Sequence, residues 1–192
     1  GNSGFCQACS QWIKAGSLKL EKTMPLFWRS GIPRALTFAP KLILMTFSVF
    51  APENYMKIAL QEAETAYEKG EIPVGAVVVS QRQVIAKGHN MTEQLQDVTA
   101  HAELIALTSA SEALGSKYLT DCQLYVTLEP CAMCAGALGW AQLEHLVFGA
   151  SDPKRGFTRL QPGVLHPKTQ LTSGIAEEEC REVLQAFFEA RR

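Results

Sequence analysis

Two short stretches of the sequence carry side chains that could hold a metal ion. HAE at residues 101–103 places a histidine two positions before a glutamate, and PCAMC at residues 130–134 places two cysteines three positions apart. One imidazole and two thiolates give zinc three protein ligands and leave a fourth position for water, which is typical of catalytic rather than structural sites. We therefore predict that His101, Cys131 and Cys134 bind Zn²⁺.

Glu103 could move protons in such a site. A carboxylate beside a zinc-bound water can take its proton, because zinc lowers the pKa of that water to about 7, and can pass the proton to a substrate. One geometric objection applies, since residues two apart do not face the same side of a regular helix. His101 and Glu103 can serve one centre only if the first turn is distorted or if Glu103 reaches across it.

Other interpretations of these residues remain open. A Cys-x-x-Cys at a helix N-terminus is also typical of a thiol redox couple, and a zinc module that binds RNA without catalysis would use the same ligands. The second pair with this spacing, Cys6 and Cys9, has no histidine or acid beside it and is interpreted as accidental. Spacing alone does not exclude four further side chains as ligands: His89, Cys122, His145 and His166.

The hydrophobic pattern predicts the elements that must position these residues. Apolar spacing predicts helices over 53–70, over 101–115 with Thr99 as N-cap, over 130–142 with Pro130 in the first turn, and at the C-terminus around Cys180–Phe188. Strands are expected at 76–80 and 84–88 as a hairpin, and at 123–128 and 145–149. This order predicts helices packed on both faces of a mixed sheet.

Composition limits the class of protein. The chain has 192 residues, 47% of them hydrophobic and 19% charged, which is typical of a globular domain. No apolar run approaches the roughly 20 residues that span a membrane, and six cysteines are too sparse for a disulfide scaffold, so a reducing compartment is expected.

Charge is distributed unevenly along the chain. Residues 1–50 hold six Lys or Arg and one acid, whereas residues 51–192 hold twelve Lys or Arg and eighteen acids. Bulk charge thus gives no support for a nucleic-acid partner. The local exception is 153–168, which contains four basic residues and no acid: Lys154, Arg155, Arg159 and Lys168.

The H-x-E and P-C-x-x-C pair is the signature of the zinc nucleobase deaminases. From about residue 52 to its end the chain also resembles the bacterial tRNA-specific adenosine deaminases, within the cytidine deaminase-like zinc hydrolase superfamily. The similar stretches are EIPVGAVVV (71–79), HN (89–90), DVTAHAELIAL (97–107), LYVTLEPCAMCAGAL (124–138) and VFGASDPKRG (147–156).

This resemblance implies an α/β fold with three α/β/α layers and a five-stranded mixed sheet. It implies hydrolytic deamination of adenosine to inosine at the wobble position of a tRNA anticodon, by attack of zinc-bound hydroxide on adenine C6. One zinc ion per subunit would be held by the three predicted ligands, and Glu103 would be the catalytic residue. We expect residues 51–192 to form this deaminase domain, and residues 1–50 to be a non-native or disordered N-terminal extension.

The resemblance also implies how substrate is bound. Asn90, Ala102 and Asp152 match substrate-binding positions, and Lys154 and Arg155 are candidate contacts to the anticodon stem-loop. The family is homodimeric, which gives the small residues at 135–139 a role in close helix packing, with ordinary core packing as the alternative. A cytoplasmic location is expected.

Three features depart from the family pattern and bear on the choice of substrate. The stretch 157–170 lacks a Gly-Ser-Leu run, Gln142 stands where many members have Arg, and Trp140-Ala141 is similar to guanine deaminases. The alternative function is therefore deamination of a free base or nucleoside of the guanine or cytosine type.

Overall fold

The computed structural model describes residues 51–160 and 163–192. The two expectations that fall on residues 1–50, an N-terminal extension and an accidental Cys6–Cys9 pair, lie outside the described residues.

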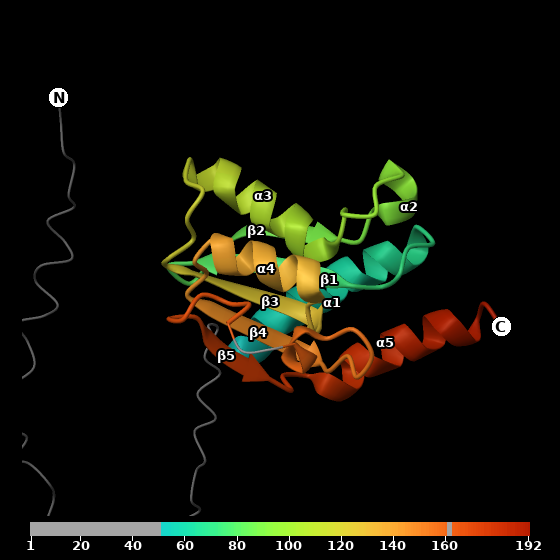
Figure 1. Ribbon diagram of the computed structural model, residues 1–192. Coiled ribbons are helices and arrows are strands. Elements are labelled where there is room, and N and C mark those ends of the chain that lie inside the picture. Colours follow the sequence, from blue (N-terminus) through green and yellow to red (C-terminus); the bar gives the residue numbers. More distant parts are fainter. Residues whose placement is uncertain (1–50, 161–162) are drawn as a thin grey trace, which may run out of the picture. The chain divides into compact units, whose positions relative to one another are not determined.

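A five-stranded mixed sheet forms the centre of the domain (Figure 1). Its strands are β1 (Gly75–Ser80), β2 (Gln83–His89), β3 (Cys122–Leu128), β4 (His145–Ala150) and β5 (Gln170–Ser173), and their order across the sheet is β2-β1-β3-β4-β5. The first two pairings, β1 with β2 and β1 with β3, are antiparallel, whereas β3–β4 and β4–β5 are parallel. The predicted mixed sheet is confirmed.

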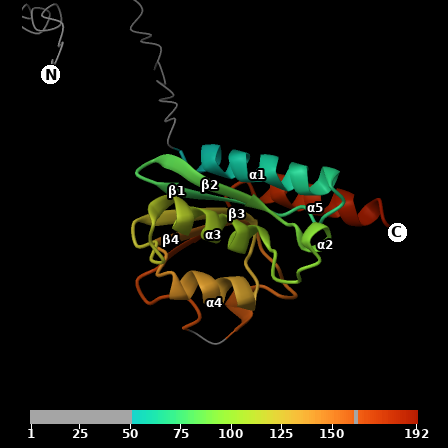
Figure 2. The ribbon, with the colours of Figure 1, turned by 90° about the horizontal axis from the view of Figure 1, so that it is seen from above.

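Helices cover both faces of this sheet. The helices are α1 (Pro52–Glu68), the short α2 (Thr92–Leu95), α3 (Ala102–Leu114), α4 (Ala132–Trp140) and α5 (Glu177–Glu189). Seen from above, α1 and α5 lie on one side of the strands and α3 and α4 on the other (Figure 2). The three-layer α/β/α arrangement expected from the resemblance is therefore confirmed.

The sequence pattern explains why two cores form. The strands β1 and β3 bury side chains on both faces, because the sheet is covered on both sides. Val78, Leu124 and Val126 pack toward α3 and α4, whereas Val77 and Tyr125 pack toward α1. Two apolar layers therefore enclose the sheet, one on each face.

Some expected details differ. Thr99 is not the N-cap of α3, because His101 occupies that position and the Thr99 hydroxyl donates to Asp97 Oδ1. Pro130 lies before the first turn of α4, whose N-cap is Cys131. The hydrophobic pattern also missed β5, a four-residue strand that is mostly exposed and so lacks an apolar signature.

Candidate metal centre

His101, Cys131 and Cys134 converge at one point. His101 Nδ1 lies 3.7 Å from Cys131 Sγ and 3.5 Å from Cys134 Sγ, and the three ligand atoms all lie within 4.8 Å of one another. Tetrahedral zinc, with bonds of about 2.3 Å to sulfur and about 2.0 Å to nitrogen, separates such ligand atoms by about 3.5 Å. The donor set and its spacing therefore fit a zinc ion with three protein ligands.

The starts of two helices supply these ligands. His101 precedes α3 with φ −76° and ψ 152°, and Cys131 precedes α4 with φ −74° and ψ 174°, so both have extended backbone at the N-cap. Cys134 lies in the first turn of α4 and is fully buried. The positive ends of both helix dipoles thus point toward the sulfur atoms, which favours thiolates there.

Hydrogen bonds among the three groups shift their pKa values. Hydrogen bonds with Cys134 and His101 lower the pKa of Cys131 to about 3. The pKa of Cys134 is raised, because it shares a hydrogen bond with Cys131 and is buried. The bond with Cys131 also raises the pKa of His101. Zinc binds cysteine as the thiolate, and the lowered pKa of Cys131 favours that form at one of the two sulfur atoms.

Glu103 is enclosed beside this group. Its side chain is 4% exposed and lies in the first turn of α3. Burial raises the pKa of the Glu103 carboxyl, and a hydrogen bond from the Glu103 backbone and the neighbouring charge of His101 only partly offset this effect. A carboxyl group whose pKa lies above its ordinary value holds a proton more readily than an exposed carboxylate does, which suits a group that accepts and returns a proton.

Asn90 is attached to the start of the same helix. Asn90 Oδ1 accepts a hydrogen bond of 3.1 Å from the Ala102 backbone N–H, and both residues are buried. The Asn90 N–H in turn donates to Val74 O at 3.1 Å. Asn90 and Ala102, two of the predicted substrate-binding residues, are therefore hydrogen-bonded to each other next to His101.

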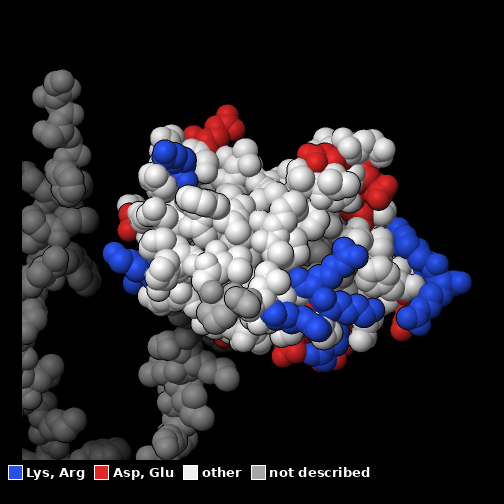
Figure 3. Space-filling model, in the orientation of Figure 1, with Lys and Arg blue, Asp and Glu red and all other residues white. Residues whose placement is uncertain are grey.

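Asp152, Lys154 and Arg155 lie on a loop after β4. Asp152 Oδ1 accepts hydrogen bonds from the backbone N–H groups of Lys154 at 2.8 Å and Arg155 at 3.0 Å. The side chains of Lys154 and Arg155 are exposed. Lys and Arg side chains gather on this face, over the loop and α5 (Figure 3), and Lys154, Arg181 and Arg192 line one pocket there.

The four side chains that spacing left open as ligands are not part of this group. His89 contacts Glu62 at 3.1 Å, and His145 contacts Thr172 Oγ1 at 2.9 Å. Cys122 is buried at the other end of β3, and His166 Nδ1 accepts from the Lys168 backbone. Within the described ranges, the His101 group alone brings three such ligand atoms together.

Sequence reasoning did not identify two buried carboxylates, Glu71 and Glu129. Glu71 is 1% exposed and accepts hydrogen bonds from Thr92 Oγ1 and from the Glu93 and Gln94 backbone. Glu129, between β3 and Pro130, is also buried. The sequence did offer a signal for both residues, because each acid lies inside a mostly apolar stretch, EIPVG or TLEPC. An acid in such a stretch is a candidate for burial, and a buried charge needs hydrogen-bond partners.

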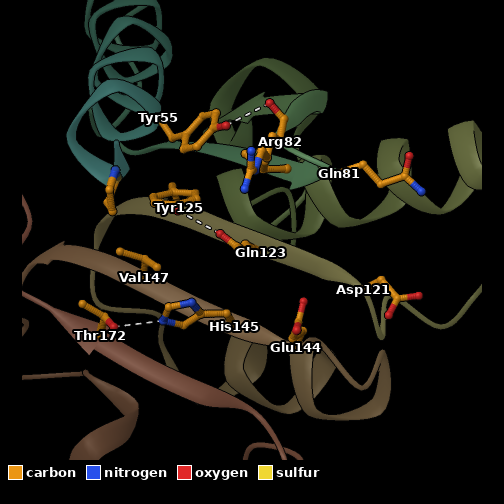
Figure 4. A pocket seen from close by; sticks show the side chains of 12 residues that line it. Tyr55, Gln81, Arg82, Asp121, Gln123, Tyr125, Glu144, His145, Val147 and Thr172 are labelled. Atoms are coloured by element: carbon orange, nitrogen blue, oxygen red, sulfur yellow. Dashed lines mark hydrogen bonds between the residues drawn. The ribbon is translucent and has the colours of Figure 1, made fainter. Parts of the chain in front are cut away.

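A cavity lies at the N-terminal end of β3, away from the candidate metal centre. It has a volume of about 580 Å³ and is lined by the β1–β2 turn and the starts of β3 and β4 (Figure 4). Tyr125 and Gln123 form part of its wall, and their side chains are bonded to each other at 2.9 Å. The length of β3, at about 3.3 Å per residue, separates this cavity from the candidate metal centre by roughly 20 Å.

Comparison with known proteins identifies relatives of the whole described domain. The family model of the MafB19-like deaminases matches residues 50–192. The tRNA-specific adenosine deaminase of Bacillus subtilis is 46% identical over 145 residues, which cover 73% of this chain and 90% of the relative. That of Agrobacterium fabrum is 44% identical over 146 residues, covering 72% and 95%.

Solved structures give the same grouping. A structure from studies of A-to-I editing by tRNA:A34 deaminases is 45% identical, with a TM-score of 0.65, and covers 68% of this chain and 99% of its own. The guanine deaminase from Nitrosomonas europaea is 24% identical, with a TM-score of 0.61, and covers 71% and 84%. The similarity to the guanine deaminase shows that the two proteins share a fold.

Proposed function

The chain belongs to the tRNA-specific adenosine deaminase family, and we propose that it converts adenosine to inosine at the wobble position of a tRNA anticodon. The observation that carries this proposal is 45% identity to a tRNA:A34 deaminase over 99% of that chain. The guanine deaminase reaches only 24% identity over 84% of its chain.

Zinc is the metal that the ligand set favours. His101, Cys131 and Cys134 would hold one Zn²⁺ per subunit, since imidazole and thiolate ligands at this spacing suit tetrahedral zinc. Bound there, zinc supplies a Lewis acid that brings the pKa of a water molecule down to about 7.

Glu103 would carry the proton during hydrolysis. Its buried carboxyl group has a raised pKa, so it can take a proton from water and deliver it to the amino group that leaves adenine C6. The oxygen of water then remains on C6, the C6–N bond breaks and ammonia leaves. Adenosine and water thus give inosine and ammonia, and Glu103 returns to its starting state.

Substrate binding would use the residues around this centre. Asn90 and the Ala102 backbone lie at the start of α3, where they can shape the adenine pocket. Asp152 would act by forming the loop that presents Lys154 and Arg155, whose charges suit phosphates of the anticodon stem-loop. This local basic surface would bind RNA although residues 51–192 are acidic as a whole.

We further propose that two copies associate through α4. Met133, Gly136 and Trp140 share one side of this helix, and Trp140 is 86% exposed. A Cβ at Gly136 would meet nothing within 4 Å, so a second copy could approach closely there. Ala135 is instead buried in its own core, and Gly139 packs against Val164 O of its own chain.

We also propose a cytoplasmic location, because a tRNA substrate is available there. None of the helices in the two described ranges has the length and apolar character that a membrane crossing requires. The cysteines in those ranges, Cys122, Cys131, Cys134 and Cys180, are all free thiols, which suits a reducing compartment.

The test is a comparison of substrates with the zinc-loaded protein. We expect inosine and ammonia from an anticodon stem-loop with adenosine at the wobble position, and no ammonia from free guanine or cytidine. Ammonia release from a free base alone would contradict the proposal and favour a small-molecule deaminase. Binding of the stem-loop without any turnover would instead indicate a zinc module that binds RNA.

A further inference from the structure

Glu129 joins the metal-binding segment to the basic loop. It follows β3 directly and precedes Pro130 and Cys131, and its side chain is only 4% exposed. Its backbone N–H donates to Ala150 O at 2.8 Å, which fixes the residue at the point where β4 ends. A carboxylate in this position stays buried only if its oxygens are well hydrogen-bonded.

The loop after β4 supplies those hydrogen bonds. Glu129 Oε2 accepts from the Asp152 backbone N–H at 3.0 Å. Oε1 accepts from the Thr158 backbone N–H at 3.0 Å and from the Thr158 hydroxyl at 2.7 Å. The two ends of the segment 152–158 are therefore both bonded to one carboxylate.

Gly156 shows how closely the loop surrounds this carboxylate. A Cβ at Gly156 would lie 2.2 Å from Glu129 Cδ and 2.3 Å from Oε1, so only glycine fits there. On the other side, the Phe157 N–H donates to Pro130 O at 3.0 Å, and Gly156 forms a β-bridge with Cys131. The loop thus contacts three consecutive residues, one of which is a predicted metal ligand.

We propose that Glu129 is a positioning residue that holds the 152–158 loop in the arrangement that binds RNA. The inference rests on the proposed function, because it assumes that Lys154 and Arg155 contact the anticodon stem-loop. Glu129 itself does not belong to the His101 group, so it acts through the loop and not on the reacting atoms. The loop can present its two basic side chains at a fixed distance from the metal only while Glu129 keeps both ends in place.

Glu129→Gln tests this role with almost no change in size. A glutamine has one amide oxygen that can accept hydrogen bonds and one NH₂ group that can only donate them. The NH₂ group would replace one of the two carboxylate oxygens and could not accept the hydrogen bond made there. Loss of hydrogen bonds to a charged group should weaken stem-loop binding by about tenfold. Zinc content and the single-turnover rate at saturating RNA should stay close to those of the wild type.

Two measurements report on the proposal. The first is the Kd for the anticodon stem-loop, and the second is trypsin cleavage of the native protein after Lys154 and Arg155, which needs no substrate. Glu129→Gln should weaken binding and speed cleavage, whereas the exposed Glu144→Gln should change neither. Faster cleavage with an unchanged Kd, or a lower saturated rate with an unchanged Kd, would overturn the proposal.

A pair of variants provides a second test if Glu129→Gln folds poorly. As a single substitution, Gly156→Ala should weaken stem-loop binding, because the added methyl group collides with the Glu129 carboxylate. In a protein that already carries Glu129→Ala, Gly156→Ala should weaken stem-loop binding no further, because the carboxylate that the methyl group would meet is gone. Such non-additivity identifies direct contact between the two residues. Additive losses would overturn the proposal. A wild-type protein that binds no stem-loop would refute the proposed function, while trypsin cleavage would still decide whether Glu129 holds the loop.

Discussion

His101 and Glu103 are two residues apart, yet only Glu103 belongs to the helix. His101 is the N-cap with extended backbone, φ −76° and ψ 152°, whereas Glu103 lies in the first turn of α3. The rule that residues two apart face different sides of a helix therefore does not apply to this pair. The sequence left two possibilities, a distorted first turn or a Glu103 side chain that reaches across it; the helix rule requires neither, since the chain enters the helix between these two residues.

Glu103→Gln should abolish turnover while the fold and the metal are retained. The amide is similar in size to the buried carboxyl group but cannot carry a proton between water and substrate. We expect the single-turnover rate on the stem-loop to fall by about 10²–10⁴-fold. Zinc content, measured by metal analysis, should match the wild type.

The control for this variant is Glu112→Gln, on the exposed side of the same helix. It should leave both rate and zinc content unchanged. Full activity of Glu103→Gln would show that another group moves the proton.

Cys134→Ser should release the metal, and Cys122→Ser should not. Both cysteines are buried, but Cys134 Sγ lies 3.5 Å from His101 Nδ1 whereas Cys122 lies outside the ligand group. Loss of one of three protein ligands should reduce zinc to well below one ion per chain. Purified wild-type protein without metal, or with a disulfide between Cys131 and Cys134, would favour redox chemistry instead.

The candidate site could be predicted from the sequence because its signal is local. Two short motifs, each at the start of a helix, supply His101, Cys131 and Cys134, and helices that follow strands meet at one edge of a sheet. Glu129 could not be predicted in the same way, because its partners Asp152 and Thr158 lie 23 and 29 residues further along the chain. Only the packed structure shows that one carboxylate holds both ends of that loop.

The helices and strands also differ in how clearly the sequence predicts them. Helix α1 has a regular apolar face that includes Met56, Ala59 and Ala63, so its spacing is visible in the sequence. Helix α2 has four residues and buries none of them, and its first residues donate hydrogen bonds to Glu71, which lies more than twenty residues earlier in the chain. Hydrophobic periodicity therefore predicts the elements that bury a regular apolar face, but not short exposed elements such as α2 and β5.

Glu71→Gln should destabilise the protein, and the loss should depend on pH. Burial acts to raise the pKa of Glu71, but hydrogen bonds from Gln94, Glu93 and Thr92 outweigh it and leave that pKa below 4.5. A carboxylate with a lowered pKa in the folded state stabilises the protein above its unfolded pKa, and this contribution is lost as the pH falls through the folded value.

The free energy of unfolding at pH 7 should therefore fall by about 1.5–3 kcal/mol in Glu71→Gln. The gap to the wild type should narrow once the pH drops below 4.5, the ordinary value for this group. Urea unfolding at several pH values measures both effects, and the exposed Glu64→Gln serves as the control. A gap that stays constant with pH would contradict the assigned role of the charge.

Removal of residues 1–44 should leave the activity intact. The family match begins at residue 50, α1 begins at Pro52, and the two cores described above are built from side chains of α1 and the elements that follow it. We therefore expect the shortened chain to keep its zinc content, its urea midpoint and its stem-loop kinetics, with Kd changed by less than about twofold. The measurement compares both chains at equal zinc loading. Loss of folding or of zinc in the shortened chain would show that this segment belongs to the domain.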